Sequence, residues 1–360
     1  MGAKKAVSLQ DVARRAGVSV STASRVLNTR LKLHLFSEKS IERVRRAAKE
    51  LGYRANYNAQ VLSSGKTSVL GVTAGIRPGA NLFELGYFAS LMRGVEFAVQ
   101  ESGYEALIIN PRGEQLAVDR GREHFHQRRI DGLINLSWLD PTAHERLLAD
   151  RDVPCVLVED FLFPSSLPVL TIDYEAALTE VVRHLATTGH RRVLWLGPDA
   201  ASGESVSRRE KAFTSAAWNA GIQGACCRFK ERRQPGDVPR FIVEADEALA
   251  QHLSQNAAFT AVVCYNDCTA AGAYRGIARV GRQVGQDIAV TGFDNDPGAQ
   301  FLYPGLTTVD PELHKVGHRA AAILIEMIAK PEAADRFQGH QESIKPRLVV
   351  RDSTMPVPNG

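Results

Sequence analysis

Two periodicities of apolar residues divide the chain near residue 67. Before that point apolar residues recur at three- and four-residue spacing in short segments, as in Leu9, Val12 and Ala16, which predicts amphipathic helices. After it, short continuous apolar runs alternate with longer amphipathic stretches. This alternation predicts parallel β-sheets with helices on both faces. The pattern therefore indicates an all-helical head followed by an α/β body.

Start and stop signals mark the helix ends in the head. Ser8 and Asp11 have the spacing of a capping box, with Asp in place of the more usual Glu or Gln. Gly17 stands where a helix end favours a left-handed backbone, and Ser19 can cap a second helix. Two short helices joined by a tight glycine turn predict a helix-turn-helix.

A third helix is needed because two short helices cannot close a core by themselves. Ser37 can cap this helix and Gly52 can end it. The inner face of the second helix is predicted to contain Val26 and Leu27 with either Val20 or Ala23. The apolar stripe of the third helix consists of Ile41, Val44, Ala48 and Leu51.

Charge is distributed unevenly between the two parts. Residues 1–66 contain 14 Lys and Arg residues against 4 Asp and Glu residues, a net charge of +10. The remainder carries a net charge of −6, which leaves +4 for the whole chain. A basic head on a mildly acidic body predicts that the head binds a polyanion.

The composition of the second helix suits a nucleic acid. It lacks acidic residues, and Arg25, about one turn beyond Ser21, can reach the edge of a guanine with its planar fork. In a helix-turn-helix this helix lies in the major groove with its first residues facing the bases. The hydroxyls that can bond phosphates or bases there belong to Ser19, Ser21, Thr22 and Ser24.

The stretch LQDVARRAGVSVSTASRVLN resembles the DNA-reading segment of the lactose/galactose repressor (LacI/GalR) family. The segment LGYRANYNAQVLSSGKTSVLGV resembles the hinge of that family. The resemblance implies that Val20, Ser21 and Arg25 read bases. It implies backbone-phosphate contacts for Ser19, Thr22, Ser24, Asn28 and Asn56, with Tyr53 beside them.

By the same resemblance Leu62 is wedged into the minor groove at the operator centre. Residues 56–64 could form barely two turns of helix, too short to be stable alone, so the segment should fold only when docked on DNA. The alternative is that Leu62 is linker or packs on the body. The chain departs from the family at Ala55, where proline is usual, and in a longer connection, NTRLKLHLF.

Seven strand candidates follow in the body: VLGVTAG, EALIIN, DGLINL, PCVLVED, RRVLWLG, AVVCYND and IAVTGFD. The blocks RRIDGLI, TTGHRRVLWLG, YNDCTAAGAYRGIARVGRQVGQDIAVTGFDN, PGLTTVD and PRLVVRDST also resemble the family, in family order. The implied fold is a lambda-repressor-like head, a hinge helix, and a periplasmic-binding-protein-like body of two Rossmann-like lobes. The implied boundaries are 1–55 for the head, 56–67 for hinge and linker, 68–172 with 311–342 for the first lobe, and 173–310 with 343–360 for the second.

Three positions expected at strand ends match effector contacts of the family, namely Arg209, Asn266 and Asp294, and Glu159 is a weaker candidate at a comparable strand end. Chemically they suit a polyol, because Asn both donates and accepts, Asp accepts from adjacent hydroxyls, and Arg binds oxygens in bidentate fashion. Where sugar-responsive members have an aromatic platform, only Phe241 is near. The region is basic, which favours an anionic ligand such as a sugar acid or sugar phosphate. The arginines concerned are Arg208, Arg209, Arg228, Arg232 and Arg233, and solvated surface charges would account for most of them.

The sequence thus predicts a cytoplasmic, dimeric transcription regulator, most often a repressor, that binds a pseudo-palindromic operator and answers to a carbohydrate-like effector. No membrane partner, cofactor or metal is expected, and the five cysteines form no pairing pattern. A solute-binding protein would have an export signal and no basic head. An enzyme is disfavoured because no G-x-S-x-G elbow occurs, and SSGKTS lacks the first glycine of a P-loop, with Gln60 in its place.

Overall fold

The change of periodicity in the sequence coincides with the boundary between two structural units, residues 1–67 and 68–360. The computed structural model describes residues 7–28, 36–54, 61–62, 65–74, 86–110, 115–136, 141–159, 165–200, 203–230, 232, 241–255 and 258–355. The connection at 29–35, Ala55 and most of the predicted hinge helix lie outside these residues.

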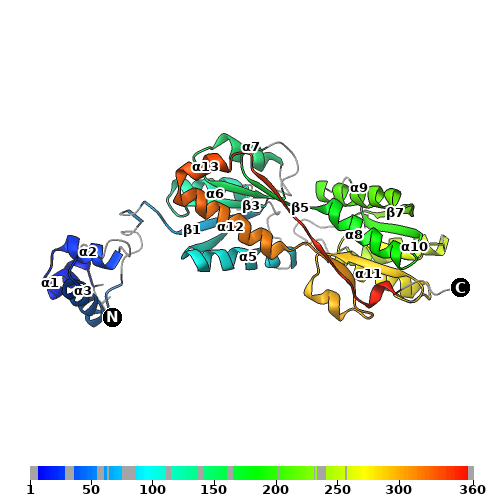
Figure 1. Cartoon of the computed structure of the whole chain (residues 1–360), viewed down its shortest axis with the longest axis horizontal. Coiled ribbons are helices and arrows are strands. Elements are labelled where there is room, and N and C mark those ends of the chain that lie inside the picture. Colours follow the sequence, from blue (N-terminus) through cyan, green and yellow to red (C-terminus); the bar gives the residue numbers. More distant parts are fainter. Residues whose placement is uncertain are drawn as a thin grey trace. The chain divides into compact units, whose positions relative to one another are not determined.

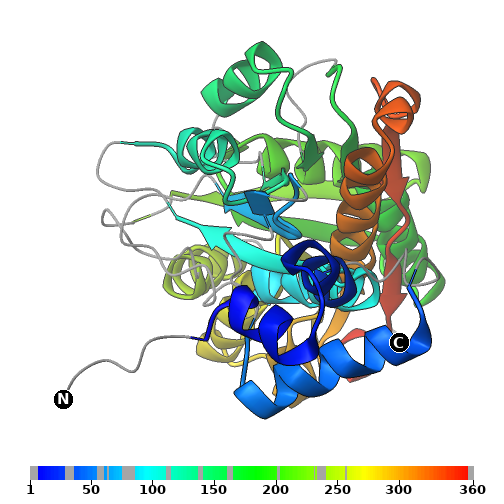
Figure 2. The ribbon, with the colours of Figure 1, turned by 90° about the vertical axis from the view of Figure 1, so that its left-hand side faces the viewer.

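The head contains three helices in its described part, drawn in blue in Figure 2: α1 (Leu9–Ala16), α2 (Val20–Asn28) and α3 (Glu38–Leu51). The predicted capping box is present, since Ser8 accepts from the Asp11 amide and Asp11 accepts from the Ser8 amide. Ser37 caps α3 by accepting from the Ser40 amide. Gly52 ends α3 with a φ angle of 63°, in the left-handed region that glycine favours.

Alanines and valines dominate the core of the head. Of the two alternatives for the inner face of α2, Ala23 is fully buried, whereas Val20 is 43% exposed. Leu9, Leu27, Ile41 and Leu51 pack around the core as partly buried residues. The buried set is Val12, Ala13, Ala16, Ala23, Val26, Val44, Ala47 and Ala48.

The body contains two six-stranded sheets in the part that the structure describes (Figure 1). The first sheet is entirely parallel, in the order β11-β5-β4-β3-β1-β2. Its strands are β1 (Val69–Ala74), β2 (Glu105–Ile109), β3 (Gly132–Leu136), β4 (Cys155–Val158), β5 (Val169–Ile172) and β11 (Gln341–Ile344).

The second sheet has the order β12-β10-β9-β8-β6-β7 and is parallel except for β12. Its strands are β6 (Arg192–Pro198), β7 (Gln223–Phe229), β8 (Ala261–Cys264), β9 (Ala289–Phe293), β10 (Thr307–Asp310) and β12 (Arg347–Val349). All seven strand candidates are confirmed. Five strands were missed: β5, β7, β10, β11 and β12. Four of them are only three or four residues long, and β7 is interrupted by polar residues.

Helices cover both faces of each sheet (Figure 1). The first sheet carries α5 (Gly86–Ser102), α6 (Ala117–His126), α7 (Pro141–Ala149), α12 (Leu313–Ala329) and α13 (Pro331–Arg336). The second carries α8 (Tyr174–Thr187), α9 (Glu204–Asn219), α10 (Ile242–Gln255) and α11 (Asp267–Arg279), with 3₁₀ turns η5 (Pro297–Phe301) and η6 (Asp352–Thr354). We call each sheet with its helices the first half and the second half of the body.

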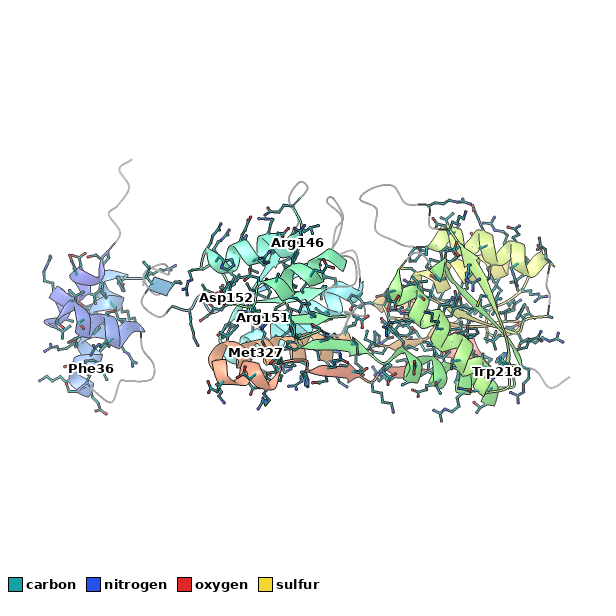
Figure 3. The ribbon with its side chains drawn as sticks, turned by 90° about the horizontal axis from the view of Figure 1, so that it is seen from above. Phe36, Arg146, Arg151, Asp152, Trp218 and Met327 are labelled. Carbon is teal, nitrogen blue, oxygen red and sulfur yellow. The ribbon has the colours of Figure 1, made fainter. Side chains whose placement is uncertain are left out.

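The chain passes between the halves three times: from β5 into α8, from β10 into α12, and from β11 into β12. Buried apolar side chains of the helices pack on both sheets. For example, Trp195 of β6 is buried against Phe213 of α9, with ring centroids 5.7 Å apart. By contrast, Trp218 near the end of α9 is 84% exposed (Figure 3).

Candidate nucleic-acid interface and effector site

The turn between α1 and α2 is fixed by a glycine and an arginine. Gly17 has a φ angle of 63°, and its amide bonds back to carbonyl groups at the end of α1. Nη2 of Arg43, on α3, donates to the Gly17 carbonyl oxygen at 3.0 Å. The turn is therefore tied to the third helix, which sets the direction in which α2 leaves the core.

The first turn of α2 presents small polar groups outward. Oγ of Ser19 accepts from the Thr22 amide at 3.0 Å and shares a hydrogen bond with Oγ1 of Thr22 at 2.9 Å. Ser21 and Arg25 are exposed, and α2 has no acidic residue in its first turn. This face has the composition that a phosphate backbone and base edges require.

The remaining residues predicted to contact DNA differ in how far their side chains are exposed. Ser24 is half-buried on α2, and the Tyr53 side chain packs against the core of the head. Leu62 is 87% exposed in a short helical segment, and its role at the operator stays a prediction. The side chain of Asn28 and the whole of Asn56 lie outside the described residues.

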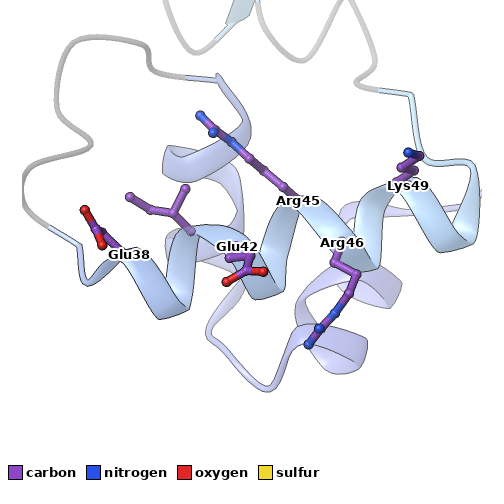
Figure 4. Close-up of a pocket in the computed structure, with 6 residues that line it drawn as sticks. Glu38, Glu42, Arg45, Arg46 and Lys49 are labelled. Carbon is purple, nitrogen blue, oxygen red and sulfur yellow. The ribbon is translucent and has the colours of Figure 1, made fainter.

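The outward face of α3 separates charges along its length (Figure 4). Glu38 and Glu42 are exposed near its beginning, while Arg45, Arg46 and Lys49 are exposed toward its end. This order complements the helix dipole, because acids are favoured at the start and bases at the end. The basic end of α3 adds to the positive charge of the head.

In the body, Arg209 is the centre of a buried group of side chains. Arg209 lies on α9 and is only 4% exposed, and its Nη1 donates to the Tyr265 carbonyl oxygen at 2.8 Å. Its guanidinium carbon stands 4.0 Å from the ring centre of Phe293, 4.7 Å from that of Tyr265 and 4.9 Å from that of Tyr174. Three rings thus replace most of the water around this cation. We call these residues, with Asp294 and Glu159, the Arg209 cluster.

Asp294 follows β9 and faces Arg209. Its Oδ1 lies 3.6 Å from Nη2 of Arg209, which is within ion-pair range but too long for a hydrogen bond. Burial raises the pKa of Asp294 to about 7 even though Arg209 acts to lower it. Among the described residues, neither Oδ1 of Asp294 nor Nε of Arg209 has a hydrogen-bond partner, although both atoms are buried.

Glu159 brings the first half of the body into the cluster. It follows β4 with a φ angle of 59° and accepts from the Ile172 amide at 3.0 Å and from the Tyr174 hydroxyl. Burial raises the pKa of Glu159 to about 7, opposed by these hydrogen bonds and by Arg209. Tyr174 therefore connects a carboxylate of the first half to the guanidinium of the second.

Asn266 stands at the start of α11, where its side chain caps the helix. Its side-chain oxygen accepts from both the amide and the hydroxyl of Thr269, each at 2.8 Å, so Asn266 is the N-cap of the helix. This leaves its amide nitrogen as the group that could meet a ligand. Its role in effector binding stays a prediction.

Sequence reasoning missed the aromatic residues around Arg209. Phe241 is a core residue, packed against Phe229 and Tyr265. A usable signal was present, since Phe293 directly precedes Asp294, and Tyr265 directly precedes the strand-end residue Asn266. A search for aromatic residues directly before the strand-end polar residues would have identified Phe293 and Tyr265 as part of the site.

The basic region that favoured an anionic ligand is neutralised by acids. Arg208 bonds to Glu204 at 3.0 Å, Arg228 to Glu210 at 2.6 Å, and Arg232 pairs with Glu247 at 3.0 Å. Arg209 pairs with Asp294, and Arg233 lies outside the described residues. These arginines therefore give little support for an anionic effector.

The described residues hold neither a metal-binding cluster nor a membrane-spanning helix. They contain no group of three or more His, Cys, Asp or Glu residues arranged to hold a metal ion. In the same part of the chain, no helix has the length and apolar character required to span a membrane.

Known proteins resemble both units. Residues 8–56 match bacterial regulatory proteins of the lacI family, and residues 182–354 match a periplasmic binding protein-like domain. A PurR-type transcriptional repressor of Pectobacterium carotovorum is 30% identical over 353 residues, 96% of either chain. The ribose operon repressor of Escherichia coli K12 is 28% identical over 358 residues, 96% of this chain and 99% of that protein.

A solved structure matches nearly the whole chain. The Lac repressor dimer, in its crystal structure with operator and the anti-inducer ONPF, matches with a TM-score of 0.78 at 25% identity. The match covers 98% of this chain and 100% of that chain. These relatives are regulators and not enzymes. With its helix-turn-helix head, its two-sheet body and its full-length relatives, the chain belongs to the LacI family of bacterial transcriptional regulators.

Proposed function

We propose that the protein is a dimeric repressor that binds a pseudo-palindromic operator and is controlled by a small neutral polyhydroxylated effector. The head supports operator binding, because α2 projects Ser21 and Arg25 outward from a turn that Arg43 holds in place. Each head would read one half-site through the major groove. The similarity to a Lac repressor dimer on operator DNA supports the same arrangement.

The effector assignment rests on one observation. Nε of Arg209 and Oδ1 of Asp294 are buried and lack hydrogen-bond partners among the described residues, and Oδ1 lies 3.6 Å from the guanidinium. A hydroxyl group can accept from Nε–H and donate to Oδ1 in the same position, which satisfies both groups. A sugar supplies such hydroxyls on adjacent carbons.

The charge of the Arg209 cluster favours a neutral ligand over an anion. One guanidinium is enclosed with two carboxylates, those of Glu159 and Asp294. An anionic ligand would meet two buried acids and a guanidinium that already has a partner, and burying uncompensated charge is costly. We therefore favour neutral sugars over sugar acids and sugar phosphates.

Exposed aromatic residues support association of two copies. Phe301 and Tyr303, at the end of η5 and just beyond it, are 81% and 96% exposed. A second copy of the chain would remove this apolar surface from water. Sedimentation of Phe301→Ser with Tyr303→Ser is expected to show a weakened dimer, and an unchanged dimer would exclude this surface.

Operator binding is tested by selecting genomic fragments with the full chain at moderate salt. On the selected operator, Arg25→Ala should cost roughly 1–3 kcal/mol and relax the preference at one base pair. Lys49→Ala, at the basic end of α3, is the matched control and should lose affinity without changing base preference. Unchanged affinity and preference in Arg25→Ala would reject the assignment of Arg25.

Effector binding is tested by measuring the melting temperature of the protein in the presence of neutral sugars, sugar acids, sugar phosphates or nucleosides. A bound ligand raises the melting temperature by mass action. We expect neutral sugars to do so, and Asp294→Ala to abolish both this shift and the effector's influence while operator binding persists. A normal response in Asp294→Ala would remove Asp294 from the site.

A further inference from the structure

The loop after β9 places consecutive polar side chains against three parts of the body. Asp294 faces Arg209, and the side-chain nitrogen of Asn295 donates to Asp310 at 3.1 Å. The third residue, Asp296, lies against α5 of the first half. Asp294 and Asn295 have φ angles of 108° and 48°, which non-glycine residues rarely adopt, so the surroundings hold the loop in this shape.

Asp296 and Gly86 are in close contact across the two halves. Gly86 is the first residue of α5, and a Cβ atom placed on it would lie 1.9 Å from Oδ1 of Asp296. No Cβ atom can approach an oxygen that closely, so the carboxylate occupies the space that any other residue would need. The lack of a side chain at Gly86 is what allows the two halves to meet here.

The buried carboxylate of Asp267 fixes the backbone of Asp296. Oδ2 of Asp267 accepts from the Asp296 amide at 2.7 Å, and its Oδ1 accepts from the Thr308 hydroxyl at 2.5 Å. Gly292 makes room for this group in the same way, since a Cβ on it would lie 2.1 Å from Oδ1 of Asp267. Two glycines therefore accommodate two carboxylates in series between β9 and α5.

The same turn of α5 reaches the Arg209 cluster. Tyr87 follows Gly86, and its buried hydroxyl is close enough for the charges of Glu159 and Asp294 to add to the effect of burial in raising its pKa. The first turn of a helix carries partial positive charge, which stabilises a carboxylate such as that of Asp296. The start of α5 therefore adjoins Asp296 at Gly86 and lies near the charges of Glu159 and Asp294 at Tyr87.

We propose that Asp296 and Gly86 form a latch between the two halves of the body, and that effector bound at Asp294 stabilises the latched position. The latch rests on the proposed effector site, because Asp294 and Asp296 share one loop. A ligand that bridges Arg209 and Asp294 fixes the loop in the shape that the latch requires. Effector binding and latching then favour each other, and the first half, which follows the head in the chain, responds to the ligand.

Hydrogen exchange of the ligand-free full chain tests the latch itself. Removing the carboxylate in Asp296→Ala should accelerate exchange of the amides in the first turns of α5 by about 2- to 30-fold, the range for loss of a side chain that stabilises a helix start. Gly298→Ala is the matched control, because no atom lies within 4 Å of where its Cβ would stand. Exchange unchanged in Asp296→Ala would overturn the latch.

A double-mutant cycle tests its link to the effector, with ribose, lactose and cellobiose as probes. The ratio of operator affinities without and with an active probe, about 5- to 150-fold for typical coupling, should fall to near one in Gly86→Ala. In an Asp296→Ala background, Gly86→Ala should have no further effect, since the methyl group then has room. A ratio that stays at the wild-type value in Gly86→Ala would refute the latch. If no sugar moves the wild type while exchange responds in Asp296→Ala, the effector assignment fails and the contact stands.

Discussion

Replacing Arg209 by Met removes the positive charge from its cluster and leaves two carboxylates. At 3.6 Å from Asp294, the pair attracts by about 4–5 kcal/mol at an effective dielectric constant of about 20. This agrees with the roughly 3–5 kcal/mol lost when one member of a buried ion pair is removed. We therefore expect Arg209→Met to lower the free energy of unfolding of the body by about 3–5 kcal/mol at pH 8.

The loss should depend on pH in a defined direction. Glu159 and Asp294 have a pKa of about 7 in the folded protein, above their ordinary values, so the folded state binds their protons more tightly than the unfolded state. Their contribution to stability is present at low pH and is lost as pH rises through about 7. At pH 5 both are protonated, the attraction to Arg209 is absent, and the loss in Arg209→Met should shrink to about 1–2 kcal/mol from its hydrogen bond.

Urea unfolding followed by tryptophan fluorescence measures this effect. All three tryptophans of the sequence lie in the body, and the buried Trp195 reports on the packing of α9. Arg208→Met is the control, because its exposed pair with Glu204 should contribute less than about 0.5 kcal/mol. A loss in Arg209→Met that is equal at pH 5 and pH 8 would show that the side chain contributes packing and no charge interaction.

Three further outcomes are expected. Gly17→Ala should lower the stability of the head by about 1–2 kcal/mol, because its φ of 63° disfavours a Cβ; an unchanged circular-dichroism melting curve of the head would contradict this. Leu62→Ala should reduce operator bending measured by energy transfer between DNA ends, and full bending would show that Leu62 is linker. Burial lowers the pKa of His184 and His190, so the stability that these two histidines contribute should be lost as pH falls below about 6.5. His190→Gln should flatten that dependence, and an identical melting profile would reject it.

The sequence determined the features that depend on neighbours a few residues away. Ser8, Ser37, Gly17 and Gly52 define helix ends because caps and left-handed turns are made within one helical turn. The alternation of apolar runs and amphipathic segments likewise predicted the seven strand candidates that the structure contains. It missed the short strands β5, β10, β11 and β12 and the polar β7, whose residues carry too little periodic signal.

Only the tertiary structure decided which charges meet. The sequence identified Arg209 and Asp294 one by one, but the aromatic rings that enclose Arg209 come from three separate segments. It could not show that acids neutralise Arg208 and Arg228, or that Asp296 fills the space beside Gly86. Caps and turns act through the local backbone, whereas the strength of a charge depends on how much water surrounding groups exclude. That exclusion is settled only when distant segments pack together.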